Sequence, residues 1–143
     1  MPVFDGTAIL AVYKGLTAGT AADVFLPIPS GGKPVIFDKV TTTNASANLS
    51  TSTATIGVNT KAAAAGTAIV TAATGTNTGL TASSKYTDCT IAASADALTL
   101  SVADAPTTLN GAPNATAGVW IRVAGTPNVT ATLDVYVAGR VLT

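Results

Sequence analysis

Histidine and glutamate, which most catalytic and metal sites use, are absent from this sequence. Without histidine the chain has no catalytic triad of the usual kind and no imidazole ligand for a metal. Its acidic residues are single, scattered aspartates without the alternating spacing of a calcium loop: Asp5, Asp23, Asp38, Asp88, Asp96, Asp104 and Asp134. Its glycine-rich segments are typical of turns and not of a phosphate-binding loop before a helix. The sequence therefore predicts a protein that is not an enzyme and has no catalytic, metal-binding or cofactor-binding residues.

Cys89 is the only cysteine. A single cysteine makes no disulfide within the chain, so the fold does not depend on oxidation. It stands between Asp88 and Thr90 in a strand-like segment, and no histidine is present to act as its base. We expect Cys89 to be a small buried hydrophobic residue and not a nucleophile.

One group of residues has the types that proteins use to bind other proteins. The only tryptophan and both arginines stand opposite apolar neighbours in alternating segments, together with a tyrosine: Trp120, Arg122, Tyr136 and Arg140. Trp, Tyr and Arg are enriched at the centres of protein interfaces. If the two segments are neighbouring strands, the four side chains form one face, and we predict a protein interface there. The alternative is that the aromatic residues cover the outer sheet face or pack under a loop, while the arginines only solubilise it.

The segments that carry these residues alternate with a period of two, which is typical of strands with one buried face. The C-terminal segment 131–143, for example, places Leu133, Val135, Val137 and Val141 on one side. Such a strand is stable only with partner strands and a second apolar layer. Similar patterns predict eight or nine short strands, from the segments 7–13, 23–28, 33–40, 54–58, 67–71, 86–91, 97–102, 119–123 and 131–143.

These strands predict an all-β fold, an antiparallel β-sandwich of the jelly-roll kind. The length of 143 residues fits a single domain that spans 1–143. Pro27 lacks a backbone donor, so its segment is predicted to be an edge strand or a short, bent one. We expect loops at 15–22 and 103–118, and 61–66 is compatible with one helical turn.

The composition is unusually poor in charge. There are 28 Ala and 26 Thr, only 10% of residues are charged, and the formal net charge is zero. An ordinary soluble domain has roughly 25% charged residues. The chain therefore has no basic surface for nucleic acid and no field that would steer a charged substrate. Because a net charge near zero promotes association, we predict a homodimer or homotrimer, or a surface covered by a larger partner. The alternative is a surface kept soluble by Thr, Asn and Ser alone.

The N-terminal residues have neither a signal peptide nor a membrane-spanning pattern, so we expect synthesis in the cytoplasm and no membrane association. Residues 1–6 have no strand pattern, but Val3 and Phe4 are apolar and Pro2 resists helix. We predict an arm at 1–6 that lies across a sister subunit or a larger partner, with Phe4 in an apolar pocket. Docking of this arm onto its own sheet is the alternative.

Three segments carry a resemblance to a known group of proteins: 97–102, 114–118 leading into 119–123, and 133–137. In these segments the chain resembles the decoration, or cement, proteins of tailed bacteriophage heads, which are similarly poor in cysteine and rich in Thr, Ala and Gly. The resemblance covers about the last third of the chain. It implies a jelly roll or related β-barrel that sits on the capsid as a dimer or trimer, and it brings no catalytic residues.

The resulting hypothesis is a structural virion protein that binds the outside of a phage capsid between major capsid subunits and stabilises the shell. Its expected partners are the major capsid protein and itself, and its expected location is the capsid exterior. Repetition supplies the binding energy, because each copy bridges several shell subunits. The alternative function is a receptor- or glycan-binding module of a tail fibre or adhesin, which would use Tyr86, Trp120 and the loop 103–118.

Overall fold

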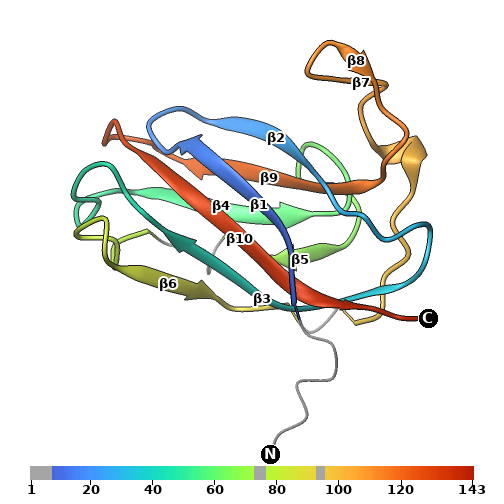
Figure 1. Ribbon diagram of the computed structural model, residues 1–143. Coiled ribbons are helices and arrows are strands. Elements are labelled where there is room, and N and C mark those ends of the chain that lie inside the picture. Colours follow the sequence, from blue (N-terminus) through green and yellow to red (C-terminus); the bar gives the residue numbers. More distant parts are fainter. Residues whose placement is uncertain (1–7, 73–76, 93–95) are drawn as a thin grey trace, which may run out of the picture.

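The computed structural model describes residues 8–72, 77–92 and 96–143. Two four-stranded antiparallel sheets pack face to face, one in front of the other in Figure 1. Sheet A contains, in spatial order, β1 (Ala8–Thr17), β10 (Thr132–Val141), β3 (Val35–Thr43) and β6 (Tyr86–Cys89). Sheet B contains β2 (Ala22–Pro27), β9 (Gly118–Gly125), β4 (Ala54–Asn59) and β5 (Ala68–Val70). The all-β sandwich that the sequence predicts is confirmed.

The eight strands pair in a nested order. β1 pairs with β10, β2 with β9, β3 with β6, and β4 with β5, each time antiparallel. Two further antiparallel pairings, of β10 with β3 and of β9 with β4, complete the two sheets. Strands that follow each other along the chain therefore often lie in different sheets, which decides where the predicted site residues come to lie.

The core lies between the two sheets, and every second residue of the strands faces it. In β10, Leu133, Val135 and Val137 are fully buried, and in β9 Val119 and Ile121 are as well. Full burial of one such side chain stabilises the fold by roughly 1.5–3 kcal/mol. Cys89, at 6% exposure, belongs to the same core cluster, which confirms its predicted role as a small buried residue.

Segment 97–102 is not the strand that its alternation predicts. Only Leu98 pairs, through two backbone hydrogen bonds with Val35 of 2.7 and 2.8 Å, and Leu100 is buried without a strand partner. On that side of β3, β6 pairs along Val40–Thr43, and the contact between Val35 and Leu98 remains an isolated bridge that does not extend into a ladder. A short 3-10 helix, η1 (Val102–Asp104), follows, and the Ser101 side chain caps it by accepting from the Ala103 N–H at 3.2 Å.

Three predicted connections also differ from the structure. β1 continues to Thr17, well into the predicted loop 15–22, because Gly15 at φ +75° accommodates an irregularity in its pairing with β10. Segment 61–66 is no helical turn, since Ala63 and Ala64 have φ values of 57° and 58°. The predicted loop 103–118 contains a hairpin, β7 (Thr108–Leu109) and β8 (Ala112–Pro113), which projects from the sandwich. The prediction for β2 is confirmed, because this strand with Pro27 lies at a sheet edge.

Candidate protein-interaction surface

The four predicted interface residues do not form one face. Trp120 and Arg122 lie on β9 in sheet B, whereas Tyr136 and Arg140 lie on β10 in sheet A. Each pair occupies the outward row of its own strand, so the pairs lie on opposite outer faces of the sandwich. The single face required the two strands to be neighbours, and this condition is not met, because β9 and β10 follow each other in sequence but lie in different sheets. Phe4 and the predicted arm 1–6 lie outside the described residues.

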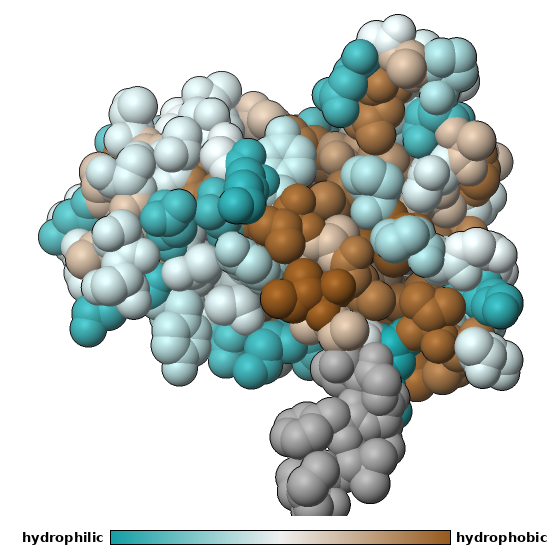
Figure 2. Space-filling view, viewed as in Figure 1, coloured by the Kyte–Doolittle hydropathy of each residue, from teal (hydrophilic) through white to brown (hydrophobic). Residues whose placement is uncertain are grey.

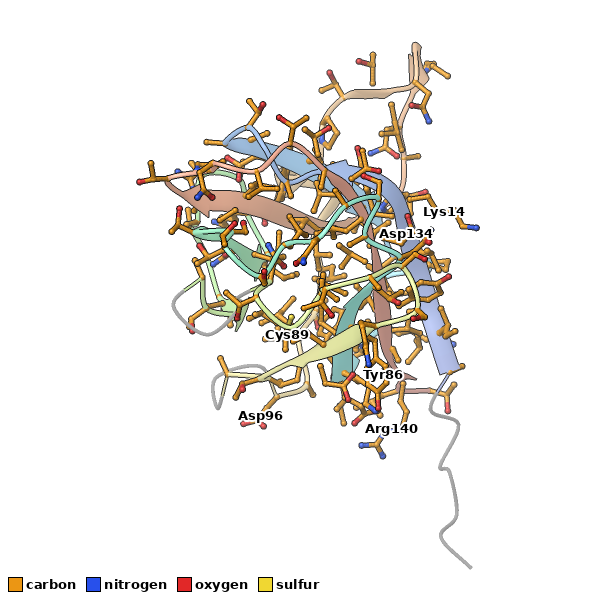
Figure 3. The ribbon with its side chains drawn as sticks, turned by 90° about the vertical axis from the view of Figure 1, so that its left-hand side faces the viewer. Lys14, Tyr86, Cys89, Asp96, Asp134 and Arg140 are labelled. Atoms are coloured by element: carbon orange, nitrogen blue, oxygen red, sulfur yellow. The ribbon has the colours of Figure 1, made fainter. Side chains whose placement is uncertain are left out.

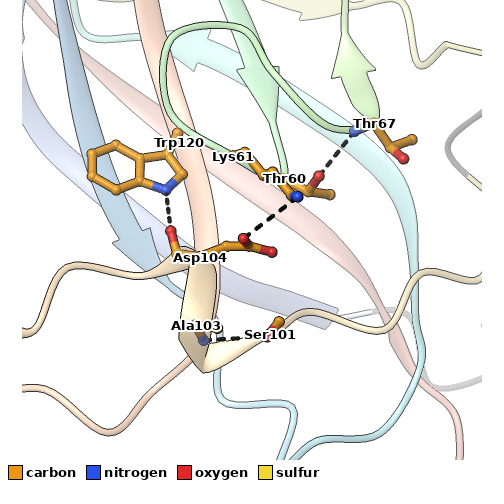
Figure 4. Close-up of polar contacts among 7 residues, drawn as sticks. All are labelled: Thr60, Lys61, Thr67, Ser101, Ala103, Asp104 and Trp120. Carbon is orange, nitrogen blue, oxygen red and sulfur yellow. Dashed lines mark hydrogen bonds and ion pairs between the residues drawn. The ribbon is translucent and has the colours of Figure 1, made fainter.

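Trp120 packs beneath a loop of its own chain. Its ring meets that of Phe25 edge to face, with centroids 5.4 Å apart and an interplanar angle of 61°. Its indole Nε1–H donates to the Asp104 backbone oxygen at 2.9 Å, as Figure 4 shows. Phe25 in turn is only 7% exposed, although it points to the outer side of sheet B. The indole N–H of Trp120 therefore already has a hydrogen-bond acceptor within the chain.

A second set of contacts holds loops over the same face of sheet B. The Arg122 Nη1 lies 3.1 Å from the Asp23 Oδ2, and that oxygen also accepts from the Ala63 N–H at 3.1 Å. Lys61 Nζ lies 3.7 Å from the Asp104 Oδ1, so that the β4–β5 connection meets the η1 segment. These contacts hold two loops against the outer face of sheet B, which the chain thereby covers itself.

The outer face of sheet A is open by comparison. A shallow groove of about 340 Å³ crosses it, lined by residues from all four strands: Ile9, Lys39, Thr41, Thr43, Tyr86, Tyr136 and Ala138. The strand register explains this gathering, because Tyr136 stands beside Thr41 while Thr43 stands beside Tyr86. The two tyrosines thus flank β3, with the two threonines between them as the floor of the groove.

Two apolar or aromatic side chains stand out of this face into solvent. Tyr86 is 67% exposed and Ile9 is 61% exposed. Figure 3 shows Tyr86 and Arg140 on the outer side of sheet A, and Cys89 on the inner side of β6. Figure 2, which looks onto this face, shows hydrophobic residues gathered over β1 and the adjoining part of β10. Exposed clusters of this kind are typical of interaction sites.

Two cations on the outer face of sheet A are paired with aspartates of the same sheet. The Lys39 Nζ lies 3.4 Å from the Asp88 Oδ2, and the Thr41 hydroxyl donates to the Asp88 Oδ1 at 2.6 Å. The Arg140 Nε and Nη2 lie 3.3 and 3.4 Å from the two carboxylate oxygens of Asp38. Because Lys39 and Arg140 each already have an anion, these two charges can be buried against an uncharged surface as pairs.

Sequence reasoning missed the residues that make this surface. Ile9, Lys39, Thr41 and Thr43 were not among the predicted interface residues, and Tyr86 entered only through the alternative glycan-binding function. The outward position of Tyr86 can be read from the sequence, because Cys89 lies three positions away and is expected to be buried. Its nearness to Tyr136 cannot, because it depends on the pairing of both strands with β3.

Two further features of the described residues concern metal binding and thiol reactivity. Among them no cluster of three or more His, Cys, Asp or Glu residues could hold a metal ion. Burial and, as the smaller cause, the neighbouring Asp88 carboxylate together raise the pKa of the Cys89 thiol from 9.0 to about 11. A thiol so rarely ionised is a poor nucleophile. No described helix has the length and hydrophobicity to span a membrane.

Comparison of the chain with protein-family models, with curated proteins and with solved structures finds no significant match.

Proposed function

We propose that this protein is a decoration protein of a tailed-phage head, which binds the outside of the capsid between major capsid subunits and stabilises the shell. The observation that carries the proposal is the contrast between the two outer faces of the sandwich. Loops of the chain cover sheet B, whereas sheet A exposes Tyr86 and Ile9 beside a groove with paired charges. Such a face suits binding that depends on area and shape and not on long-range steering.

The strand order supports a finer description of the fold. We propose that the sandwich is a jelly roll, the architecture that many capsid proteins use. Support comes from the nested pairing, in which the first of the eight sheet strands pairs with the last, the second with the seventh, and so inward to β4 and β5. A long antiparallel hairpin that is rolled up as a whole has this order.

The test is capsid binding by two matched variants. Tyr86→Ala removes an exposed tyrosine from sheet A, and Val102→Ala, at a side chain that is 50% exposed, removes an apolar side chain outside both sheets. We expect wild-type protein and Val102→Ala to co-sediment with undecorated capsids and to raise their unfolding temperature. Tyr86→Ala should bind at least about tenfold more weakly, as truncation of an interface tyrosine does. Equal binding of both variants, or capsids that gain no stability from the protein, would contradict the proposal.

One observation favours a second candidate, a glycan-binding module. The groove on sheet A has two tyrosines, whose rings can stack on a sugar, and two threonine hydroxyls, which donate within the chain but can still accept hydrogen bonds. Trp120, which the glycan hypothesis also named, lies packed on Phe25 and contributes less to such a site. Specific binding of the isolated protein to a glycan array, lost in Tyr86→Ala, would favour this function over shell binding.

A further inference from the structure

The sandwich has four edge strands, β1 and β6 in sheet A and β2 and β5 in sheet B. Edge strands expose backbone N–H and C=O groups that pair readily with another chain, and proteins usually protect them. Three of these edges are protected, because β5 has 3 residues, β6 has 4, and β2 ends in Pro27. β1 is the exception, with 10 residues.

The first part of β1 has the composition of a strand that pairs with others. Residues 8–13 contain no charge, no proline and no glycine, and they are exposed or half-buried throughout. Uncharged segments of this length with high strand propensity associate edge to edge when they are left open. Register shifts beside Leu10 and after Tyr13 leave Ala11, Val12 and Tyr13 as the regular ladder with β10. The uncharged first half of β1, before the register shift after Tyr13, is therefore the part of this edge that is suited to pairing.

A cleft lies beside this edge. A cleft of about 510 Å³ separates β1 from β2, lined by 11–14 on one side, by 24–27 on the other, and by Leu109 and Asn110 of the hairpin. Within the described part of the chain no strand pairs with β1 on this side. The unpaired backbone N–H and C=O groups of this edge can form hydrogen bonds with another extended strand, so an extended strand is the partner that fits it.

We propose that β1 pairs antiparallel with β1 of a second copy, across a twofold axis close to Ala11. Such a contact is self-complementary and closes at two copies. It sets uncharged residues against uncharged residues, and the net charge of zero means that the copies do not repel each other. With the axis at Ala11, the two Lys14 side chains are six positions apart along the ladder, about 20 Å. That separation exceeds the Debye length of about 8 Å at physiological salt, so the two lysines do not oppose pairing.

This dimer has a consequence for the open face of sheet A. A twofold axis between antiparallel strands stands perpendicular to the sheet, so it joins both copies of sheet A into one continuous sheet. The two grooves with Tyr86 and Tyr136 then lie on the same side of the dimer. Two linked sites bind a repeating surface more tightly than one, which deepens the proposed shell binding. The pairing itself does not depend on shell binding, so the two proposals can fail separately.

Cross-linking by single cysteines tests the contact directly. In a Cys89→Ala background, cysteine is placed singly at Ile9, Leu10, Ala11, Val12 and Tyr13, and at Ala22 on β2 as the matched control. Only the residue at the axis faces its own copy within disulfide reach, because neighbouring positions diverge along the strands. We expect one of the five variants to convert mostly to a disulfide-linked dimer under mild oxidation, while the other four and Ala22→Cys stay largely monomeric on a non-reducing gel.

Light scattering of the wild-type protein over a wide range of concentrations completes the experiment. Dimers in solution together with one dominant cross-linking position support the proposal. Monomers at every concentration would overturn it. Dimers with five variants that cross-link no faster than Ala22→Cys would also overturn it, because they would place the contact elsewhere. If capsids are present in the reaction and β1 cross-links to a capsid subunit in place of a second copy, this edge binds the shell, and the proposal is contradicted.

Discussion

At the scale of single residues, the structure gives several polar side chains a partner within the chain where the sequence suggested a partner outside it. Arg122 and Arg140, predicted at an interface, each meet an aspartate. Asp134 lies in the outward row of β10, yet it is only 8% exposed. Its two carboxylate oxygens accept from the Gly15 N–H and from the Asn44 Nδ2, each at 3.0 Å. It thereby fixes the irregular part of β1 to the loop after β3.

Cys89 leads to a prediction about pH. Its folded pKa of about 11 lies above the value of 9.0 for an exposed thiol, so the neutral thiol favours the folded state. The contribution of Cys89 is complete below pH 9, and it is lost as the pH rises towards 11, because the unfolded chain then releases its proton first. We expect the urea midpoint of the wild-type protein to fall over this range more than that of Cys89→Ala, which controls for titrating Lys and Tyr residues.

Alkylation provides the second readout for Cys89. Iodoacetamide at pH 8 should label the folded protein far more slowly than the protein in denaturant, since the thiol is both buried and protonated. Labelling of the two forms at similar rates would show that Cys89 is accessible, contrary to its place in the core.

At the scale of elements, the decisive fact is that β9 and β10 follow each other along the chain but belong to different sheets. Each strand keeps its predicted inward row, and each carries its outward row to a different side of the sandwich. Sheet B receives the β4–β5 connection and the η1 segment as a cover, through Lys61, Asp104 and Trp120. In sheet A, no segment among the described residues covers the groove between Tyr86 and Tyr136 in this way.

A close approach between β10 and β3 gives a prediction at this scale. A Cβ added at Gly139 would lie 2.1 Å from the Ile36 backbone oxygen, next to a register shift between the two strands. Gly139→Ala must therefore displace the backbone of a central strand, and we expect a loss of about 1–3 kcal/mol in the free energy of unfolding. The matched control is Gly57→Ala in β4, where the nearest atom would be 3.4 Å away, an ordinary contact. Equal urea midpoints for the two variants would contradict the close approach.

At the scale of the whole molecule, the two ends of the described chain meet in one sheet. β1 and β10 pair along their length, and β10 lies between β1 and β3 in the interior of sheet A. Contacts between residues so distant in sequence close late and slow folding, because a long loop must be ordered first. The last strand is therefore required for the sheet and is not an appendage.

Truncation tests this requirement. Removal of residues 132–143 takes Leu133, Val135 and Val137 out of the core and leaves β1 without a partner, so we expect a chain with no cooperative unfolding transition by circular dichroism. The control replaces 108–113, the projecting β7–β8 hairpin, with a short glycine-serine linker, because that hairpin forms a separate two-stranded sheet. This variant should retain a cooperative transition. A cooperative transition in the truncated chain would mean that sheet A forms without its central strand.

The sequence by itself determined which segments form strands and which of their residues are buried, because a period of two is a local property of the backbone. Leu133, Val135 and Val137 could be assigned to the core without any partner strand in view, and Cys89 could be assigned there from its chemistry. The absence of histidine and glutamate is likewise a property of the sequence alone. Segment 97–102 shows the limit of this reasoning. Its residues alternate and Leu100 is buried, but the segment does not form a strand.

Only the tertiary structure decided which outward rows share a face. The outward direction of Trp120 and Tyr136 follows from alternation, but their placement on opposite faces follows from the pairing of β9 with β2 and β4 and of β10 with β1 and β3. These pairings join residues that are far apart in the sequence, from Asn59 with Trp120 to Ala8 with Gly139, and no local pattern encodes them. The open groove of sheet A therefore could not be found in the sequence, because Ile9, Tyr86 and Tyr136 become neighbours only when both ends of the chain enter one sheet.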